Sequence, residues 1–269
     1  MKIFESFNIL NKEINFDENI GFVPTMGCLH NGHLSLIKLA KLKSKKILVS
    51  IYINPAQFND KKDFQKYPRS LKKDISKLIK HKVDYLFLPS DKEIYKKGIR
   101  KKIRISQKDK IMCAKYRKGH FEGVLAVVNR LIKNINAKFI FFGEKDFQQI
   151  YLIKKYVLNK SSAKLISCKT VRNKNKLPLS SRNILLSKKY MIRSERISKF
   201  LLNFRNKIKK NINNKILLKF YKSKINKLCD KIEYLEIRNS NNLSNNINKN
   251  NFKIFIAYRQ NKIRLIDNI

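Results

Sequence analysis

The sequence predicts an α/β protein with a Rossmann-like parallel sheet, followed by a smaller α+β domain. Short apolar runs at 47–53, 85–88 and 139–142 are rich in β-branched or aromatic residues, which is typical of strands covered on both faces. Segments with apolar residues at helical spacing separate these runs, as in βαβ units. The C-terminal part instead has two helical stretches followed by alternating strands. We therefore expect two domains, 1–171 and 172–269.

The chain is strongly basic, but its charge is spread along its whole length. Its 269 residues include 62 Lys and Arg against 19 Asp and Glu, for a formal net charge of +43. A basic stripe interleaved with aromatic residues would indicate nucleic-acid binding. Lysine, isoleucine and asparagine instead recur in every segment, so we interpret the charge as a compositional bias and expect no specific nucleic-acid partner. A basic nucleic-acid-binding protein is the alternative from another functional class.

The cysteines and the apolar segments indicate a soluble, cytoplasmic protein. Cys28, Cys113, Cys168 and Cys229 are widely separated and form no Cys-x-x-Cys pair, which argues against a zinc site or a disulfide framework. No apolar stretch approaches membrane-spanning length. We expect reduced thiols and no membrane partner.

The first strand, turn and helix contain the most informative stretch of the chain. Residues 21–25 are predicted to form a buried strand and residues 27–31 a tight turn, and the helix begins at Gly32. His30 and His33 lie on either side of this helix start, where unpaired backbone N–H groups and the helix dipole attract an anion. The turn is therefore a predicted phosphate site, with two ordinary surface or core histidines as the alternative. The apolar face of the helix consists of Leu36, Ile37, Leu39 and Ala40.

The strand at 47–53 ends at a second candidate site. Ligands of open α/β sheets bind beyond the carboxyl ends of the strands, which is where Asn54 and Gln57 follow. Gln57 offers both a donor and an acceptor to a small hydroxy acid. A loop glutamine in water is the alternative interpretation.

The next segments are expected to be structural. Ser90 and Glu93 have the spacing of a capping box after the strand at 85–88. Ile103 and Ile105 alternate with charged or polar residues, which predicts an edge strand within 96–110. The helix before them is predicted from an apolar face of Leu71, Ile75, Leu78 and Ile79.

A third candidate site follows the strand at 139–142. Gly143 permits close backbone approach, Lys145 provides a charge for phosphate, and Asp146 can accept hydrogen bonds from a ribose. Gln149 lies one helical turn beyond Lys145, so both can face one pocket. The alternative is an ordinary charged helix start. Before this strand, a loop at 116–123 opens an apolar helix, and its His120 has either a nucleotide contact or a role in helix start and packing.

A polar hinge at 171–183 follows the last predicted strand of the sheet, 164–170. It contains Leu179-Ser-Ser-Arg182, whose hydroxyls and guanidinium suit pyrophosphate oxygens, although a plain linker is favoured when the string is seen alone. The C-terminal domain is expected to contain helices at 187–211 and 214–230, strands at 232–237, 253–258 and 262–267, and an asparagine-rich turn region at 239–251.

Taken in this order, the motifs resemble those of the pantothenate synthetase family over residues 1–269. The resemblance rests on Pro24-Thr-Met-Gly-x-Leu-His-x-Gly-His33, Ile51-x-x-Asn-Pro-x-Gln-Phe58, Gly143-Glu-Lys-Asp146 and Leu179-Ser-Ser-Arg182. It implies a fold of the His-x-Gly-His nucleotidyltransferase type with a C-terminal lid. The chain departs from the family at Lys118, where proline is usual, and at Asn175–Pro178, where Asp-Gly-Leu-Ala is usual.

The resemblance also implies roles for individual residues. His33 is in addition predicted, from the chemistry of imidazole, to donate a proton to the phosphates, because an adjacent phosphate favours its charged form; His30 and Lys145 are the further catalytic groups. Asn54, Gln57 and Gln149 would bind pantoate. The ATP-binding set would comprise Met26, Gly27, Cys28, Leu29, His30, Asn31, Gly32, His33, Gly143, Glu144, Lys145, Asp146, Val171, Leu179, Ser180, Ser181 and Arg182.

The implied reaction is the ATP-dependent condensation of (R)-pantoate with β-alanine to pantothenate, AMP and pyrophosphate through a pantoyl adenylate. ATP would be the co-substrate, Mg²⁺ would accompany it with protein ligands unknown, and the protein would be a homodimer. Another His-x-Gly-His adenylyltransferase is the alternative within enzymes, although it would have no need of Asn54, Gln57 and Gln149.

Overall fold

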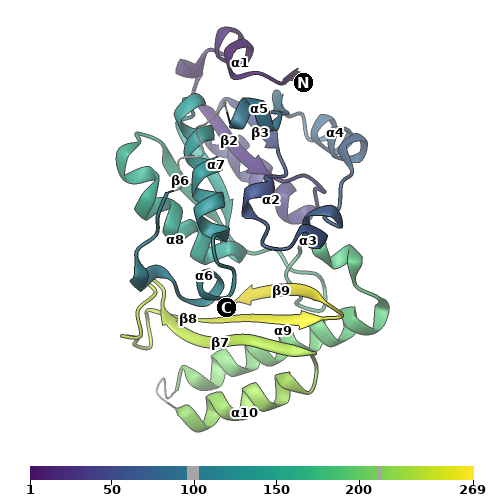
Figure 1. Ribbon diagram of the computed structural model, residues 1–269, viewed down its shortest axis with the longest axis vertical. Helices are drawn as coiled ribbons and strands as arrows, with labels where there is room; N and C mark the ends of the chain where they lie inside the picture. The colour runs from purple at the N-terminus through teal and green to yellow at the C-terminus, as the bar shows by residue number, and fades with distance from the viewer. Residues whose placement is uncertain (96–102, 211–213) are drawn as a thin grey trace. The chain divides into compact units, whose positions relative to one another are not determined.

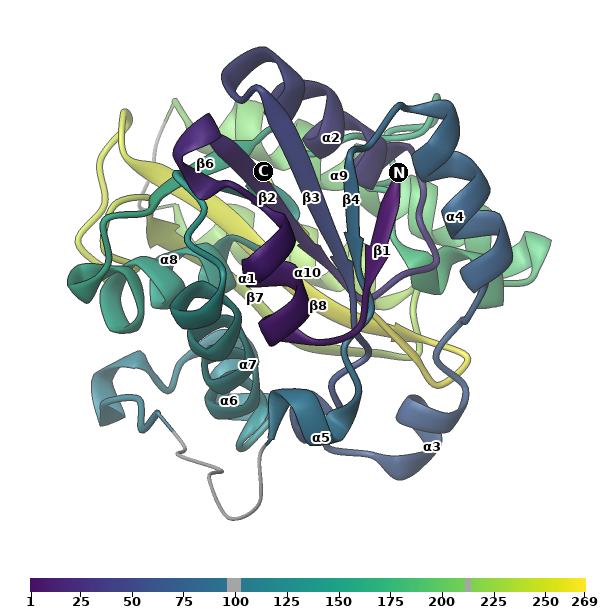
Figure 2. The ribbon, with the colours of Figure 1, turned by 90° about the horizontal axis from the view of Figure 1, so that it is seen from above.

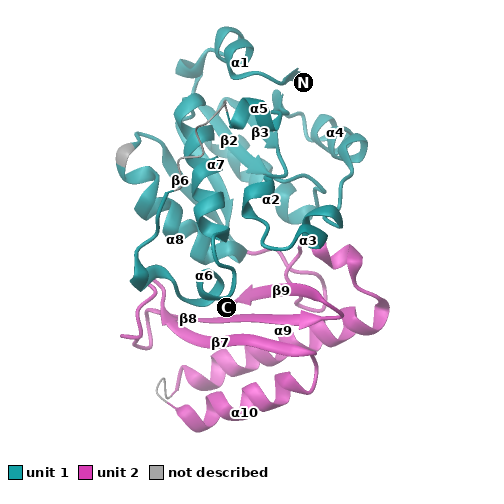
Figure 3. Ribbon diagram, in the orientation of Figure 1, with its two compact units in different colours: residues 1–169 teal, residues 170–269 magenta. Residues whose placement is uncertain are grey.

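The computed structural model describes residues 1–95, 103–210 and 214–269. The chain divides into two compact units, Met1–Lys169 and Thr170–Ile269 (Figure 3). Among the described residues, no helix has both the length and the apolar character needed to cross a membrane.

The first unit is built on a six-stranded sheet in which every strand pair is parallel, as the sequence predicted (Figure 1). The strand order is β1-β4-β3-β2-β5-β6, so β2 and β5 are neighbours in the sheet. The strands are β1 (Lys2–Phe4), β2 (Ile20–Thr25), β3 (Lys46–Ile51), β4 (Tyr85–Phe87), β5 (Phe139–Gly143) and β6 (Lys164–Cys168).

Helices cover both faces of this sheet (Figure 2). On one face, α2 and α4 pack over the central strands through Ile37, Leu78 and Val49, which are fully buried. On the other face, α1 packs its Phe7 ring 4.8 Å from that of Phe87 in β4. The helices of the unit are α1 (Phe7–Glu13), α2 (Asn31–Lys43), α3 (Lys61–Gln65), α4 (Leu71–Lys80), α5 (Asp91–Ile94), α6 (Met112–Tyr116), α7 (His120–Asn134) and α8 (Phe147–Tyr156).

The apolar face predicted for α4 is wrong in part. Leu78 is buried, but Leu71 and Ile79 are 46% and 58% exposed. Asp74 occupies the buried side instead and is 1% exposed. The helix therefore turns a carboxylate, and not a continuous apolar stripe, toward the sheet end.

The edge strand predicted within 96–110 is also not formed in its described part. Residues 103–110 are irregular apart from a 3₁₀ turn at Gln107–Asp109, and residues 96–102 lie outside the described residues. Hydrogen bonds from side chains fix this segment, whereas backbone hydrogen bonds to a neighbouring strand were expected. The Asp109 carboxylate accepts from Lys155 Nζ at 2.9 Å, and the Ser106 N–H donates to Tyr156 Oη at 2.9 Å.

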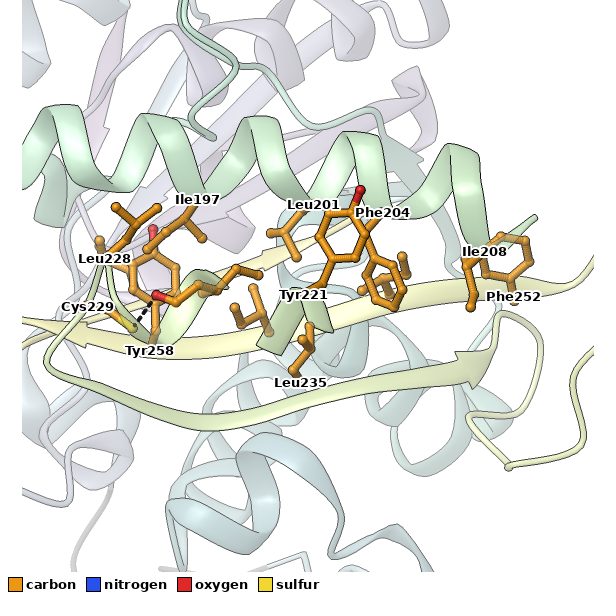
Figure 4. Close-up of a cluster of buried hydrophobic side chains, with 14 of the residues drawn as sticks. Ile197, Leu201, Phe204, Ile208, Tyr221, Leu228, Cys229, Leu235, Phe252 and Tyr258 are labelled. Atoms are coloured by element: carbon orange, nitrogen blue, oxygen red, sulfur yellow. Dashed lines mark hydrogen bonds between the residues drawn. The ribbon is translucent and has the colours of Figure 1, made fainter. Parts of the chain in front are cut away.

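The second unit packs two helices, α9 (Lys188–Ile208) and α10 (Lys215–Asn226), against one antiparallel sheet. Its strands β7 (Lys231–Asn239), β8 (Phe252–Gln260) and β9 (Ile263–Asn268) pair in that order. Figure 4 shows their apolar side chains meeting those of α9 and α10. The predicted α+β content of this part is thus confirmed. The fully buried residues of the hydrophobic core of this unit include Ile197, Phe204, Ile208, Ile225, Ile256 and Tyr258.

Candidate active site

The turn between β2 and α2 has a backbone that few side chains favour. Gly27 and Cys28 have φ angles of +74° and +49°, in the left-handed region that suits glycine. The Gly27 N–H donates to Thr25 Oγ1 at 3.1 Å, and the Thr25 hydroxyl donates to the Ser50 carbonyl at 2.8 Å. A Cβ on Gly27 would lie 3.2 Å from Asp74 Oδ2. Both the backbone conformation and the limited space therefore favour glycine at position 27.

Asp74 holds the rest of this turn. The N–H groups of Cys28 and Leu29 donate to its two carboxylate oxygens, each at 2.7 Å, and the Ser70 hydroxyl adds a third bond at 3.2 Å. Lys77, one turn further along α4, donates to the Leu29 carbonyl. Sequence reasoning missed both Asp74 and Lys77. The available signal was a carboxylate three residues after Leu71, on the face where the pattern predicted only apolar groups.

The two histidines form a reciprocal cap at the start of α2. The Gly32 N–H donates to His30 Nδ1 at 3.1 Å, and the His30 N–H donates to His33 Nδ1 at 3.3 Å. Their ring centroids are 4.1 Å apart. The helix begins at Asn31, one residue before the predicted start. His30 and His33 are thus brought together at the helix start, as the sequence predicted.

The cap determines which nitrogen carries the proton. Because Nδ1 of each neutral ring accepts a backbone N–H, the ring hydrogen must be on Nε2. Neither Nε2 atom has a hydrogen-bond partner in residues 1–95, 103–210 or 214–269. The site therefore contains two adjacent imidazole donors at the positive end of a helix.

Burial and neighbouring cations keep both imidazoles neutral. Burial lowers the pKa of His30 to about 4, and the Lys145 charge adds to this effect. Burial also lowers the pKa of His33 well below its usual value, with further contributions from His30, Lys145 and Lys77. The charged form of His33 was predicted beside a bound phosphate. In the free site, burial and the two lysines oppose that form, and the proton donation itself stays a prediction.

The end of β5 contributes the cation of the predicted ATP motif. Lys145 Nζ lies 3.5 Å from Asp146 Oδ1, and its charge acts on both imidazoles. A Cβ on Gly143 would meet nothing within 4 Å, so the space beside this strand end is open. Glu144 accepts from the Ser167 hydroxyl at 3.3 Å. Residues that follow β2 and β5 thus meet at one site, since their strands are neighbours.

The loop after β3 approaches the same turn. Gln57 is 8% exposed, and its amide Nε2 donates to the sulfur of Met26. Asn54 is 1% exposed, and its amide is occupied by protein groups: it accepts from Ala56 N at 3.1 Å and donates to the Gly123 carbonyl at 3.0 Å. Asn54 also accepts from the Tyr95 hydroxyl at 2.8 Å. These bonds suit a residue that shapes the loop better than one that contacts substrate directly.

Two further predicted residues have different surroundings. Gln149 is half-buried on the first turn of α8, and its amide has no hydrogen bond to the described residues. His120 lies at the start of α7, where its Nδ1 is 2.7 Å from the Gln57 carbonyl oxygen. The contact with the Gln57 carbonyl supports the second of the two interpretations of His120, a role in packing.

The remaining predicted ATP residues belong to the second unit. The Leu179 N–H donates to the Val171 carbonyl at 2.9 Å, and the Arg182 N–H donates to Ser180 Oγ at 3.3 Å. Ser181 is buried. These bonds order the Leu179-Ser-Ser-Arg182 segment within its own unit.

The hinge that departs from the family pattern is a well-connected turn. Asn173 Oδ1 accepts from the N–H groups of Asn175 and Leu177, both at 3.0 Å. The Glu195 carboxylate accepts from both asparagine amides, at 2.7 and 2.8 Å. Arg172 forms a bidentate pair with Asp267 at 2.7 and 2.8 Å. The altered residues thus have partners that hold the turn.

Comparison with known proteins gives a consistent result over both units. The sequence model of the pantoate-beta-alanine ligase family matches residues 2–269. The pantothenate synthetase of Wigglesworthia glossinidia brevipalpis is 41% identical over 260 residues, which cover 93% of this chain and 90% of the relative. That of Francisella philomiragia is 39% identical over 272 residues, which cover 99% and 95%.

Solved structures agree with these relatives. The crystal structure of pantothenate synthetase from Thermus thermophilus has a TM-score of 0.91 at 29% identity, covering 100% of this chain and 99% of that one. The pantoate-beta-alanine ligase of Francisella tularensis, complexed with beta-gamma ATP and beta-alanine, has a TM-score of 0.87 at 37% identity, covering 100% and 97%.

Proposed function

The chain belongs to the pantoate–β-alanine ligase family, and we propose how its residues carry out that reaction. The enzyme condenses pantoate with β-alanine, using ATP as co-substrate, to give pantothenate, AMP and pyrophosphate. The observation that carries the proposal is the pair of neutral imidazoles at the start of α2, with Lys145 and Lys77 within electrostatic reach.

The chemistry requires activation of the acid, because a carboxylate is a poor electrophile. In the first step a pantoate carboxylate oxygen attacks the α-phosphorus of ATP, and the bond to the β-phosphate oxygen breaks. Pyrophosphate leaves with the bonding pair, and a pantoyl adenylate remains. The site must therefore align the carboxylate with the α-phosphate and stabilise negative charge on the departing group.

We assign the stabilisation of that charge to the residues around the α2 start. Nε2–H of His30 and of His33 donates to phosphate oxygens, while Lys145 supplies a positive charge. Because His33 is neutral in the free site, it acts first as a hydrogen-bond donor and not as a stored proton. Arg182 and the hydroxyls of Ser180 and Ser181 are proposed as further donors to the phosphates of ATP.

Gln57 and Gln149 are proposed to bind pantoate. Their amides offer donors and acceptors for a hydroxy acid, and Gln57 lies against Met26 of the phosphate turn. In the second step the β-alanine amine attacks the acyl carbon, the bond to AMP breaks, and the amine loses a proton. Closure of the second unit, a proposed lid, would protect the mixed anhydride from water.

Mg²⁺ is proposed to arrive on the phosphates of ATP. No group of three His, Cys, Asp or Glu side chains in the described part of the chain could hold a metal ion. Asp146, whose side chain is 47% exposed beside Lys145, is one carboxylate that fits, since Mg²⁺ takes one or two carboxylates plus substrate phosphates. When bound, the ion would offset phosphate charge.

The family resemblance also leads us to propose a homodimer in the cytoplasm. Burial raises the pKa of the Cys168 and Cys229 thiols to about 11, so both stay protonated near neutral pH. Light scattering on the purified chain tests the dimer: the expected mass is twice the 31.9 kDa of one chain.

The function is tested by incubating the protein with ATP, Mg²⁺, pantoate and β-alanine and measuring pantothenate and AMP. Both products should require all four additions. Pantoate-dependent exchange of labelled pyrophosphate into ATP, without β-alanine, isolates the first step. AMP transfer to a phosphorylated acceptor, without any need for pantoate, would instead support another adenylyltransferase.

A further inference from the structure

The segment at the start of α7 makes a set of contacts with the loop that carries Gln57. His120 Nδ1 lies 2.7 Å from the Gln57 carbonyl oxygen, and Arg117 Nη2 donates to the same oxygen at 3.3 Å. Arg117 Nη1 also lies 2.8 Å from His120 Nε2. Gly123 completes the contact, because its carbonyl accepts from the Asn54 amide at 3.0 Å. Two donors from one segment thus converge on one backbone oxygen.

The arginine fixes the tautomer of the histidine. A guanidinium group only donates, so His120 Nε2 must be the acceptor of the Arg117 bond. The ring hydrogen is then on Nδ1, where it donates to the Gln57 carbonyl. Both lone pairs of that carbonyl are occupied, and the peptide after Gln57 has a fixed orientation.

This orientation places the side chain on which pantoate binding is proposed to depend. Gln57 is held at its carbonyl by Arg117 and His120 and at its amide by Met26. The backbone before Gln57 cannot move toward α7, because Ala56 already lies so close to Gly123 that no Cβ would fit between them. A displacement of about 1 Å at such a residue can cost about 10²-fold in rate.

We propose that Arg117 and His120 are positioning residues that set the affinity for the hydroxy acid through the Gln57 backbone. Neither needs to touch a substrate. The inference rests on the proposed role of Gln57 in binding pantoate, and it assigns to this pair an effect on pantoate that is absent for ATP.

Matched substitutions separate the two bonds of His120. In His120→Asn the amide nitrogen occupies the place of Nδ1, so a donor to Gln57 is retained and the acceptor for Arg117 is lost. In His120→Gln the amide reaches the place of Nε2, so the donor to Gln57 is lost. We expect the pantoate KM to rise about tenfold in His120→Gln and Arg117→Lys, the equivalent of one net hydrogen bond. His120→Asn should stay within about threefold of the wild type.

The ATP KM and the thermal midpoint distinguish positioning from a general loss of structure. Both are expected to stay close to wild type in all three variants. His81→Gln is the control, because its Nδ1 also lies 2.9 Å from a backbone carbonyl, that of Lys77, but away from Gln57. Equal rises in both KM values, or no change in the pantoate KM of His120→Gln, would overturn the inference.

Failure of the proposed function gives a different result. If wild-type protein lacks pantoate-dependent pyrophosphate exchange, the role of Gln57 is lost together with this inference. If wild-type exchange is normal but His120→Gln and Arg117→Lys keep the wild-type pantoate KM, the function stands and the positioning role is refuted.

Discussion

The substitution Gly123→Ala tests how closely α7 must approach the Gln57 loop. A Cβ at this position would lie 2.3 Å from the Ala56 carbonyl oxygen and 3.0 Å from Gln57 N, whereas ordinary contact begins at 3.4 Å. The loop and the helix must therefore separate by about 1 Å. Both contacting groups are backbone, so no side chain can rotate away.

Two opposing energies set the expected result. In an unobstructed helix, alanine in place of glycine stabilises by about 1 kcal/mol. Overpacking a tight contact costs about 1–3 kcal/mol, so the variant should be less stable by up to about 2 kcal/mol. Since the loop moves, the pantoate KM should also rise, by about tenfold or more.

Urea unfolding and steady-state kinetics with each substrate varied in turn measure both effects. The sign of the stability change is decisive, because helix propensity and steric contact predict opposite signs. A variant that is more stable than wild type and has an unchanged pantoate KM would show that the close approach is not required.

Four further changes test other parts of the site. His33→Ala should lower the rate of pyrophosphate exchange by about 10²- to 10³-fold, the effect of losing one preorganised donor; full exchange would exclude the role. Gln57→Ala should weaken pantoate and leave ATP unchanged, whereas a change in ATP alone would reassign the residue. Asp74→Asn leaves the Cys28 or Leu29 N–H without an acceptor, so it should raise the ATP KM and cost about 1–3 kcal/mol of stability. Asp84 likewise accepts a backbone N–H, that of Ile47 at 2.9 Å, so Asp84→Asn is the control that should leave the ATP KM unchanged. The pKa of His30 is about 4 in the folded protein and 6.5 when unperturbed, so the unfolded chain binds more protons between these two pH values. The free energy of unfolding should therefore fall as the pH drops from 6.5 to 4. His30→Asn keeps a helix cap and should reduce this fall by about 3 kcal/mol, as measured by urea titrations at each pH.

The parallel sheet could be predicted from the sequence because its strands are short apolar runs. Such runs are recognised from their own residues, without knowing which strand each one pairs with. The sequence also predicted which side chains follow β2 and β5. The parallel order of these strands brings His33 and Lys145 to the same edge, as the general rule for such sheets requires.

The errors arose where distant side chains decide the local structure. The spacing of the apolar residues predicted that Leu71 and Ile79 lie on the buried face of α4. Asp74 is buried instead, because its carboxylate accepts hydrogen bonds from the Cys28 and Leu29 N–H groups. The protonation of His33 likewise depends on burial and on lysines far away in the sequence. Neither effect is visible in a local window.

These distant contacts divide the support of the site between two helices. Asp74 and Lys77 of α4 hold the turn where phosphate is proposed to bind, and the start of α7 holds the loop proposed for pantoate. The Gln57 amide, which donates to Met26, joins the two parts. A carboxylate attacking the α-phosphorus must be aligned with it to within a fraction of an ångström. The relative position of α4 and α7 on the sheet is therefore expected to contribute to that alignment.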